Sequence, residues 1–501
     1  EYDQALQRVL ALAEGRSNSI HTEAAVASPE ALEAAIQTLP NELPELGFGL
    51  KTATDVLLHT VVPALNPGHN GGRYFGFVTG GTLPSATVAD LVVPLFDQNV
   101  QVHLPNESIS TVVEAHAVAL SQDLIGLSRE RWEGTLTTGA TSSNVISLCC
   151  AREAVIRRIM SRSKAGNASG PTVTQEWSLA EHGIGPDTPA VNIFTALPHN
   201  SIAKAAAITG IGRQRIAQKE AACLEVDLER LEDALRKAQR AEQGAVVVIG
   251  MGEVNTGALC GQLREIRILC DEYHAWLHVD AAFAAFACLV PGFEWVSSDL
   301  DLADSITSDA HKQLNVPYDC GLFYIRRKTA AGAVSDSRTL SGAERRRQYA
   351  MSQPSPLFRN IENSRRFRAL PLYTALLSQG RSGYVALVKR NVKFAKRLRR
   401  WLRFHQAFEV LTPAPDDKLA PEDASRASRV PWALDEWGYN IVLFRASQAC
   451  PNARLAGAEG AGRLVEAIKK TGQMYVSGTS WNGKGAVRIA VSSWLTGLDK
   501  D

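Results

Sequence analysis

A lysine and a histidine stand side by side in the stretch DSITSDAHKQLNVPYDCGLFYIR, residues 304–326. Lys312 and His311 occupy a polar corner between two short apolar strands, which are predicted at Ser305–Thr307 and Gly321–Ile325. Burial of a lysine as a cation is costly, so a lysine in a core-like corner needs a chemical reason. We expect the amine of Lys312 to act as a nucleophile that joins a carbonyl compound covalently.

Three other strand ends carry polar or small residues that could assist such a lysine. Gly139, Ala140 and Thr141 lie between a strand and a helix start, where small residues and the helix dipole favour a phosphate. Any strand-to-helix turn also favours Gly and Ser, so this signal alone is not specific. His199 follows the strand VNIFTALP, and Asp280 ends the strand LHVDAA. His199 could equally be an ordinary loop residue, and Asp280 could equally be a helix N-cap.

These positions require elements that bring them to one edge of the fold. From about residue 130, apolar strands such as AVVVIGMG alternate with helices such as SSNVISLCCAREAVIRRIM. This alternation predicts an α/β fold with a mostly parallel central sheet flanked by helices. Ligands of open α/β sheets lie at the carboxyl ends of the strands. The 32 residues from Asp280 to Lys312 leave room for a crossover that returns the lysine to the same end of the sheet.

The chain divides into three predicted segments. Residues 1–105 are helical patches joined by turns rich in Pro and Gly, and 106–365 form the large α/β domain. Residues 366–501 form a small α+β domain with the strands NIVLFRA and AVRIAVSS. A long basic helical stretch at 364–404 comes before these strands. Within the large domain, Ser161–Ala190 is rich in Gly, Ser and Pro and is predicted to be an exposed insertion.

Together the four loops describe a site for pyridoxal 5'-phosphate. Lys312 would hold the cofactor covalently and release it to the amine of a substrate. Asp280 would keep the ring nitrogen protonated, so that the ring can accept electrons from the substrate. His199 would stack on the ring and could assist proton transfer. No spacing of Cys and His residues suggests a metal site.

The same residues resemble a known family. LHVDAAFAAFACL and DSITSDAHKQLNVPYDCG are similar to the group II pyridoxal phosphate-dependent decarboxylases, the fold type I set that contains aromatic-L-amino-acid, glutamate and histidine decarboxylases. The likeness extends to GRYFGFVTGGTLPSATVADLVVPLFDQNV, TTGATSSNVISLCCAREA and SRRFRALPLYTALLSQGRSGY, and so runs from about Pro67 to Thr496. It implies a homodimer with active sites at the subunit interface and an N-terminal helical segment that wraps the partner.

The resemblance also implies roles for individual residues. Ala140, Thr141 and His311 would contact the phosphate, and Ala282 would lie against the ring. In the family, a tyrosine on a mobile loop after the lysine protonates the carbon that has lost its carboxylate. The loop at 339–356 contains one tyrosine, Tyr349, which could equally be a surface residue. Relatives without this tyrosine can form an aldehyde with oxygen, so Tyr349 and His199 together favour simple decarboxylation to an amine.

Two places depart from the family pattern. Gln313 follows the lysine where the family often has Trp, and Glu253 and Val254 occupy positions that commonly carry a Thr-Thr pair. Asn255 and Thr256 are possible substitutes for that pair. These changes leave the lysine, acid and histidine in place, and bear on the choice of substrate or subfamily.

The substrate side chain is predicted from the N-terminal region. Tyr74, Phe75, Phe77 and His103 lie where the family builds its side-chain pocket, and an aromatic lining suits an aromatic L-amino acid better than glutamate. These aromatic residues could equally belong to a dimer core. Another fold type I reaction stays open, namely aldehyde synthesis, a lyase reaction, amino transfer or carbon–carbon bond formation in secondary metabolism. A binding protein without activity is disfavoured, because the lysine, acid and histidine are all present.

Composition limits the partners and the compartment. The 501 residues include 53 Lys and Arg against 52 Asp and Glu, a balance that argues against broad binding to nucleic acid or to an anionic membrane. No apolar run is long enough for a membrane span, and no signal-peptide pattern opens the chain, although a leader removed before Glu1 stays open. Eight cysteines, several of them in apolar patterns, indicate buried thiols and a reducing compartment, for which we expect the cytoplasm.

Overall fold

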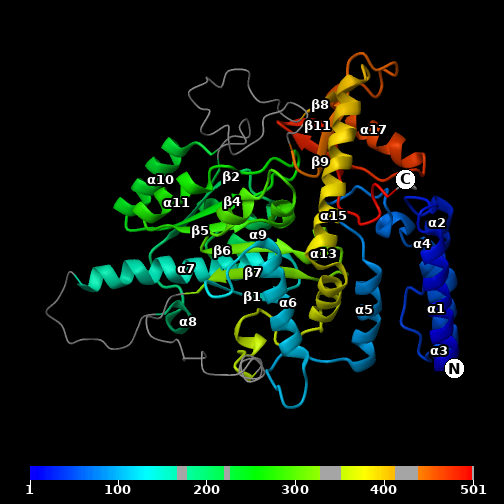
Figure 1. The fold of residues 1–501 in the computed structure, drawn as a ribbon, viewed down its shortest axis with the longest axis horizontal. Coiled ribbons are helices and arrows are strands. Elements are labelled where there is room, and N and C mark those ends of the chain that lie inside the picture. The colour runs from blue at the N-terminus through cyan, green and yellow to red at the C-terminus, as the bar shows by residue number, and fades with distance from the viewer. Residues whose placement is uncertain (166–177, 219–225, 328–350, 412–437, 499–501) are drawn as a thin grey trace. The chain divides into compact units, whose positions relative to one another are not determined.

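The computed structural model describes residues 1–165, 178–218, 226–327, 351–411 and 438–498 of the chain (Figure 1). The chain separates into two compact units. The large unit comprises Thr82–Lys389 and Pro413–Tyr439, and the second unit comprises Glu1–Gly81, Arg390–Thr412 and Asn440–Asp501. In the part of the chain that the structure describes, no helix combines the length and the apolar character needed to cross a bilayer.

The large unit is built on a seven-stranded sheet with the strand order β1-β7-β6-β5-β4-β2-β3. Its strands are β1 (Trp132–Thr137), β2 (Val191–Ala196), β3 (Ile216–Gln218), β4 (Gly244–Gly250), β5 (Trp276–Asp280), β6 (Ser305–Asp309) and β7 (Gly321–Arg326). Strands β3, β2, β4, β5 and β6 run parallel to one another, whereas β7 is antiparallel to both of its neighbours, β6 and β1. The predicted α/β fold with a mostly parallel central sheet is therefore confirmed.

Helices cover both faces of this sheet (Figure 1). On one face, Ile193, Val246 and Val248 pack in a core with apolar residues of α7 (Ala140–Ala165) and α9 (Asn200–Ile208). Successive side chains of a strand point to opposite faces. Val247 accordingly lies on the other face, with Leu231 of α10 (Leu228–Arg240). The next helix along the chain, α11 (Leu263–Glu272), packs against α10 and β5.

The large unit also contains α5 (Pro84–Phe96), α6 (Ser110–Ile125), α8 (Leu179–His182) and α12 (Trp295–Leu300). The predicted insertion at Ser161–Ala190 overlaps the end of α7, which continues to Ala165, and contains α8. Residues 166–177 lie outside the described residues, so the insertion itself stays a prediction. Arg, Met and Ala residues favour a helix, so the sequence extends α7 beyond the point at which its apolar pattern fades.

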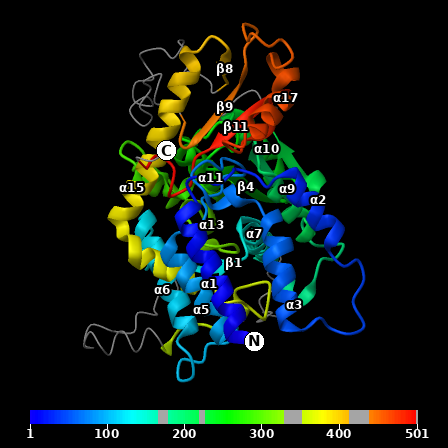
Figure 2. The same cartoon turned by 90° about the vertical axis from the view of Figure 1, so that its right-hand side faces the viewer.

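The second unit contains a four-stranded antiparallel sheet with the order β10-β11-β9-β8 (Figure 2). Its strands are β8 (Phe408–Val410), β9 (Ile441–Ala446), β10 (Ser477–Trp481) and β11 (Lys484–Ala490), and α17 (Gly457–Lys470) packs on the sheet. The same unit contains α1 (Tyr2–Ser19), α2 (Pro29–Thr38), α3 (Gly49–Val56) and α4 (Val62–Ala64). The predicted small α+β domain is thus present.

The compact units differ from the predicted segments at their boundaries. Helix α5 belongs to the large unit, although it falls within the predicted segment 1–105. The residues before it join the C-terminal sheet instead, because Tyr74 forms a parallel bridge with Tyr475 and the amide of Ala490 donates to the Phe75 carbonyl at 3.0 Å. Helix α15 (Ala369–Phe404) begins in the large unit, and its residues from Arg390 onward belong to the second unit.

Candidate active site

The lysine lies directly after strand β6, on the short helix α13 (Ala310–Gln313). Its amine Nζ is 2.9 Å from Oδ2 of Asp309, the last residue of the strand. The side chain of Lys312 is 20% exposed, so it is mostly buried but reaches solvent. Its neighbour His311 is anchored by Nδ1, 2.9 Å from the carbonyl oxygen of Cys320, and burial lowers the pKa of His311 below its usual value.

Asp309 connects the lysine to the start of α7. The amide of Ala140 donates to Oδ1 of Asp309 at 2.7 Å, while Oδ2 of the same carboxylate lies against Lys312. Asp309 is only 2% exposed. A buried carboxylate thus occupies the N-terminus of a 26-residue helix, where backbone amides and the helix dipole favour an anion. The sequence reasoning did not single out Asp309, although its place one residue before the His-Lys pair is a visible signal.

Asp280 ends strand β5 at the same edge of the sheet. Its Oδ2 accepts from Nδ2 of Asn144 at 2.9 Å, and its Oδ1 accepts from the amide of Ala282 at 3.2 Å. In the sheet register Asp280 lies between Gly250 of β4 and Thr307 of β6. The second carboxylate is therefore held by an amide side chain from α7 rather than by a cation.

His199 is the N-cap of α9. Its Nδ1 accepts from the amide of Ser201 at 3.2 Å and lies 2.8 Å from the Ser201 hydroxyl. Nδ2 of Asn144 is 3.1 Å from that same hydroxyl and also binds Asp280. Although His199 follows β2 and Asp280 is the last residue of β5, the two residues are thus linked through Asn144 and Ser201. The structure therefore brings the predicted phosphate turn at Ala140, the histidine, the acid and the lysine corner to one edge of the sheet.

The loop after β4 satisfies its own polar groups. The carboxylate of Glu253 accepts from the amide of Asn255 at 2.9 Å and from Nδ2 of Asn255 at 3.1 Å. It also accepts from the amide of Thr256 at 2.6 Å and from the Thr256 hydroxyl at 2.8 Å. Thr256 is completely buried, and its part in replacing the family's threonine pair stays a prediction. Gln313 is completely buried as well, beside the lysine.

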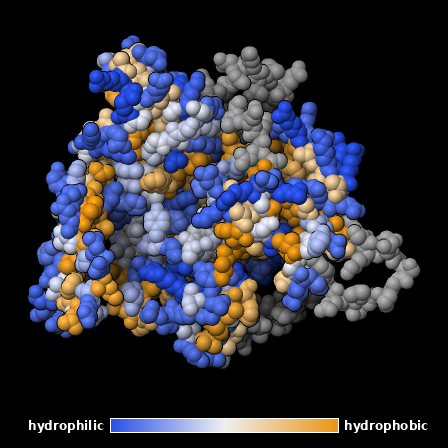
Figure 3. All heavy atoms as spheres, turned by 180° about the vertical axis from the view of Figure 1, so that it is seen from behind, coloured by the Kyte–Doolittle hydropathy of each residue, from blue (hydrophilic) through white to orange (hydrophobic). Residues whose placement is uncertain are grey.

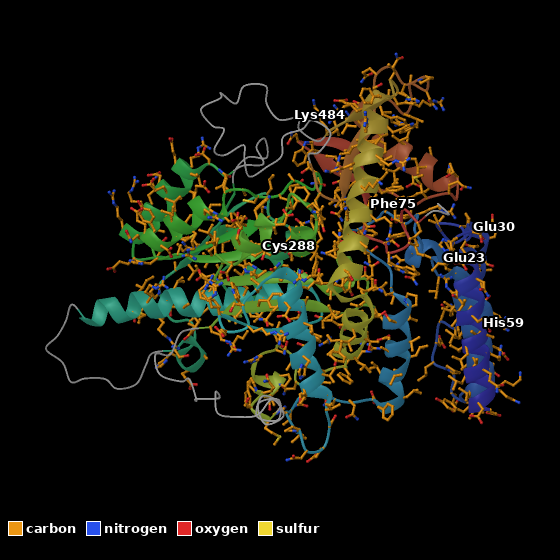
Figure 4. All side chains as sticks on the ribbon, viewed as in Figure 1. Glu23, Glu30, His59, Phe75, Cys288 and Lys484 are labelled. Carbon is orange, nitrogen blue, oxygen red and sulfur yellow. The ribbon has the colours of Figure 1, made fainter. Side chains whose placement is uncertain are left out.

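The residues predicted to line a substrate pocket divide between the two units. Phe75, labelled in Figure 4, is 4% exposed in the core of the second unit, where its ring lies 6.0 Å from that of Phe394. The ring of Tyr74 stacks on Tyr475 at 4.4 Å, whereas Phe77 is 60% exposed. The packing of Tyr74 and Phe75 thus explains their apolar surroundings without a ligand. Their place in a substrate pocket stays a prediction.

His103 belongs to the large unit. Its Nδ1 is 2.8 Å from the Thr111 hydroxyl, and its amide donates to the hydroxyl of Ser355 at 3.0 Å. Ser355 lies at the end of the loop predicted to carry the proton donor. Tyr349 itself falls outside the described residues, so its role stays a prediction. Among the described residues, no cluster of three or more His, Cys, Asp or Glu side chains is arranged to hold a metal ion.

The residues at this edge fit a pyridine ring that carries a phosphate and an aldehyde. A partly exposed amine can meet the aldehyde, a helix N-terminus can meet the phosphate, and a carboxylate can meet the ring nitrogen. The Thr307 hydroxyl lies beside Asp280 and is buried without a partner among the described residues, as expected if a further group occupies this site. A Cβ on Gly321 would lie 2.5 Å from Cα of Gly139, so glycine at this position lets β7 approach the phosphate turn.

Comparisons with known proteins agree with this chemistry. A family model described as pyridoxal-dependent decarboxylase conserved domain matches residues 75–419. The 3,4-dihydroxyphenylacetaldehyde synthase of Aedes aegypti is 24% identical over 385 residues, covering 74% of this chain and 69% of that protein. The L-2,4-diaminobutyrate decarboxylase of Acinetobacter baumannii is 25% identical over 285 residues, 56% of this chain but only 53% of that relative. The chain therefore spans about half the length of some curated relatives.

A solved structure matches nearly the whole chain. The structure of Oryza sativa TDC with PLP and tryptamine has a TM-score of 0.76 at 20% identity and covers 99% of this chain and 94% of that chain. Likeness at this identity establishes the fold. The family model covers more than half of the chain and includes Ala140, His199, Asp280 and Lys312. The chain belongs to the pyridoxal-dependent decarboxylase family, and its cofactor is pyridoxal 5'-phosphate.

Proposed function

We propose that this decarboxylase converts an aromatic L-amino acid into the corresponding amine and carbon dioxide. The observation that carries the proposal is the meeting of Lys312, Asp280, His199 and the α7 N-terminus at one sheet edge. The aromatic substrate is supported by relatives. One similar protein is named for a dihydroxyphenyl product, and one similar structure contains tryptamine.

When bound, pyridoxal 5'-phosphate draws electrons from the substrate's alpha carbon, which allows the carboxylate to leave as carbon dioxide. The amine of Lys312 would hold the cofactor covalently and return to it after turnover. The start of α7, at Ala140 and Thr141, and His311 would bind the phosphate. The carboxylate of Asp280 would keep a proton on the pyridine nitrogen.

Three further residues would act on the ring and on the departing product. Ala282 and His199 would lie against the ring, and His199 would also restrict the pose of the substrate. Tyr349 would donate the proton that completes the amine, a step for which a placed acid contributes about 10²–10⁴-fold. Without such a donor, dioxygen and water can instead convert the same carbon into an aldehyde, with release of ammonia and hydrogen peroxide.

The aldehyde route is the second candidate function. The Aedes aegypti relative, which aligns with 74% of this chain, is named as an aldehyde synthase. His199 and Tyr349 favour the amine. The two routes share the loss of carbon dioxide, but only the aldehyde route consumes oxygen and releases ammonia and peroxide, so one assay with separate product readouts distinguishes them.

We also infer that the chain acts as a homodimer in a reducing compartment, for which we propose the cytoplasm. Apolar side chains reach the surface in several patches (Figure 3). On α5, Val88, Leu95 and Phe96 are 64%, 61% and 71% exposed, a face that a second copy could cover. Sedimentation equilibrium should give twice the chain mass, and charged substitutions at Val88 and Leu95 should shift the dimer toward monomer.

A panel of single amino acids tests the proposed function. The protein, loaded with pyridoxal phosphate, should release carbon dioxide from one or more of tryptophan, tyrosine, phenylalanine and 3,4-dihydroxyphenylalanine. Amine, aldehyde and peroxide should be measured in the same reactions. Borohydride should fix the cofactor on Lys312, and Lys312→Ala should neither be labelled nor release carbon dioxide. Carbon dioxide from glutamate or diaminobutyrate alone would overturn the aromatic assignment, and a labelled protein that releases none would overturn decarboxylation.

A further inference from the structure

We propose that Asn144 and His278 are positioning residues that hold the side chains of Asp280 and His199 in place through one buried hydrogen-bond network. The network starts behind the active-site edge, where His278 of β5 is completely buried. Its Nε2 lies 2.9 Å from Oδ1 of Asn144, and its Nδ1 lies 3.0 Å from the hydroxyl oxygen and 3.1 Å from the carbonyl oxygen of Ser305. The inference builds on the roles proposed for Asp280 and His199.

The hydrogens of the His278 ring can be assigned from its partners. Burial lowers the pKa of His278 to about 4, so the ring is neutral near pH 7 and carries a single proton. Nε2 faces only the amide oxygen of Asn144, which can only accept, whereas Nδ1 has the Ser305 hydroxyl as a donor beside the Ser305 carbonyl. We therefore assign the proton to Nε2, which donates it to Asn144. Nδ1 then accepts from Ser305, whose oxygen also accepts from Nε1 of Trp276 at 2.9 Å and lies 2.8 Å from the Ser147 hydroxyl.

The side chain of Asn144 connects His278 to both Asp280 and His199 by hydrogen bonds. Its oxygen is used by His278, which leaves the two amide hydrogens for Oδ2 of Asp280 at 2.9 Å and for the Ser201 hydroxyl oxygen at 3.1 Å. The reverse orientation of the amide would place its oxygen against a carboxylate oxygen and is excluded by repulsion. Ser201 keeps its own hydrogen for Nδ1 of His199, 2.8 Å away.

Every group in this chain of contacts therefore has one consistent role. Asn144, Ser147, His278 and Ser305 are all 0% exposed, and unsatisfied polar groups at such depth would be costly. Two hydrogen bonds of the network lead to Asp280: His278 donates to Asn144, and Asn144 donates to Asp280. His278 thus acts on Asp280 only through Asn144, which is a property that mutation can test.

Affinity for pyridoxal phosphate provides a readout that does not depend on turnover. We expect Asn144→Ala to weaken binding of the cofactor by about 10- to 100-fold, the range found when outer partners of metal ligands are removed. His278→Leu should weaken it to a similar extent, whereas His278→Gln, which retains an amide donor toward Asn144, should stay close to the parent. In the double variant Asn144→Ala/His278→Leu, the loss should equal that of Asn144→Ala alone.

Catalysis provides a second readout. If the network positions Asp280 and His199 for chemistry, kcat should fall in Asn144→Ala while KM for the amino acid changes much less. The pH dependence of the bound cofactor's absorbance should also shift in this variant, because the partner of the ring nitrogen has lost a donor. If the parent protein binds the cofactor but releases no carbon dioxide from amino acids, that result counts against the proposed function and not against the network.

Ser121→Ala is the matched control. Ser121 lies on α6, is completely buried, and has its hydroxyl 2.8 Å from that of Tyr324. Its loss removes a comparable buried hydrogen bond outside the network and should leave cofactor affinity and kcat unchanged. The proposal is overturned if Asn144→Ala binds the cofactor as the parent does, if Ser121→Ala loses as much, or if the losses of the two single variants add fully in the double variant.

Discussion

Removing the carboxylate of Glu114 should destabilise the large unit and loosen the phosphate turn together. Glu114 meets Arg365 in a two-pronged ion pair, with nitrogen–oxygen distances of 3.1 and 3.0 Å. The side chain of Arg365 is 0% exposed and that of Glu114 is 6% exposed. Arg365 also donates to the carbonyl oxygens of Val100, at 3.1 Å, and Leu136, at 2.7 Å. Leu136 lies near the end of β1, only a few residues before Ala140.

The expected magnitude follows from the burial of the arginine. Glu114→Ala leaves the Arg365 guanidinium buried without its counter-charge, which typically costs about 3–5 kcal/mol. With an unfolding entropy of about 2.1 cal/mol/K per residue, the large unit, of about 335 residues, should lose roughly 4–7 °C in its melting temperature. Because the arginine also holds the Leu136 carbonyl, we expect the variant to bind pyridoxal phosphate more weakly.

Circular dichroism at a fixed scan rate measures the melting temperatures of Glu114→Ala, Arg365→Met and the double variant. Replacement of both charges by apolar groups can be nearly neutral, so the double variant should recover part of the loss seen in Glu114→Ala. Lys237→Gln is the control, because Lys237 pairs with Asp233 on the exposed surface of α10 and its loss should leave the melting temperature unchanged. A change below about 2 °C in Glu114→Ala, or simple addition of the two single losses, would refute the reasoning.

Three other predictions concern the active-site edge. Because burial lowers the pKa of His278 from 6.5 to about 4, the folded chain binds fewer protons than the unfolded chain between these values, and roughly 3 kcal/mol of stability present above pH 6.5 is lost as the pH falls toward 4. Denaturant titrations at pH 7 and 4.5 should show a smaller loss in His278→Gln. Asp309→Asn should bind pyridoxal phosphate about tenfold more tightly in absorbance titrations, because it removes a negative charge next to the proposed phosphate site at Ala140; weaker binding would instead make Asp309 a support of the bound cofactor. Asp280→Asn should lower kcat by roughly 10²-fold or more while borohydride still labels the lysine, and near-parent turnover would exclude its role at the ring nitrogen.

The position of each functional strand end was visible in local sequence. Apolar strands are short and end where a polar residue begins, so VNIFTALP predicted the strand that ends before His199 and LHVDAA predicted the strand that ends at Asp280. The observed β2 and β5 agree with these predictions within two residues. The alternation of strands and helices also determined the fold class, because only helices on both faces can cover such uniformly apolar strands.

The direction of β7 follows from the length of the chain before it. Only a short segment separates Asp309 from Gly321, too short for a crossover between parallel strands, so antiparallel pairing of β6 and β7 follows from chain length. The start of α7 at Ala140 rather than at Ser142 could not be derived. It depends on the carboxylate of Asp309, which arrives from another strand and binds the Ala140 amide.

The residue types of the active site were therefore determined by the sequence itself, since a lysine, an acid and a histidine at strand ends are local features. Their supporting partners were decided only by the tertiary structure. Asn144 and Asp280 are 136 positions apart, and His278 reads as one more residue of a buried strand. Hydrophobic periodicity tells which face of an element is buried, but hydrogen-bond partners across that face depend on the register of β5, β6 and α7, which is set by the packing of the whole sheet.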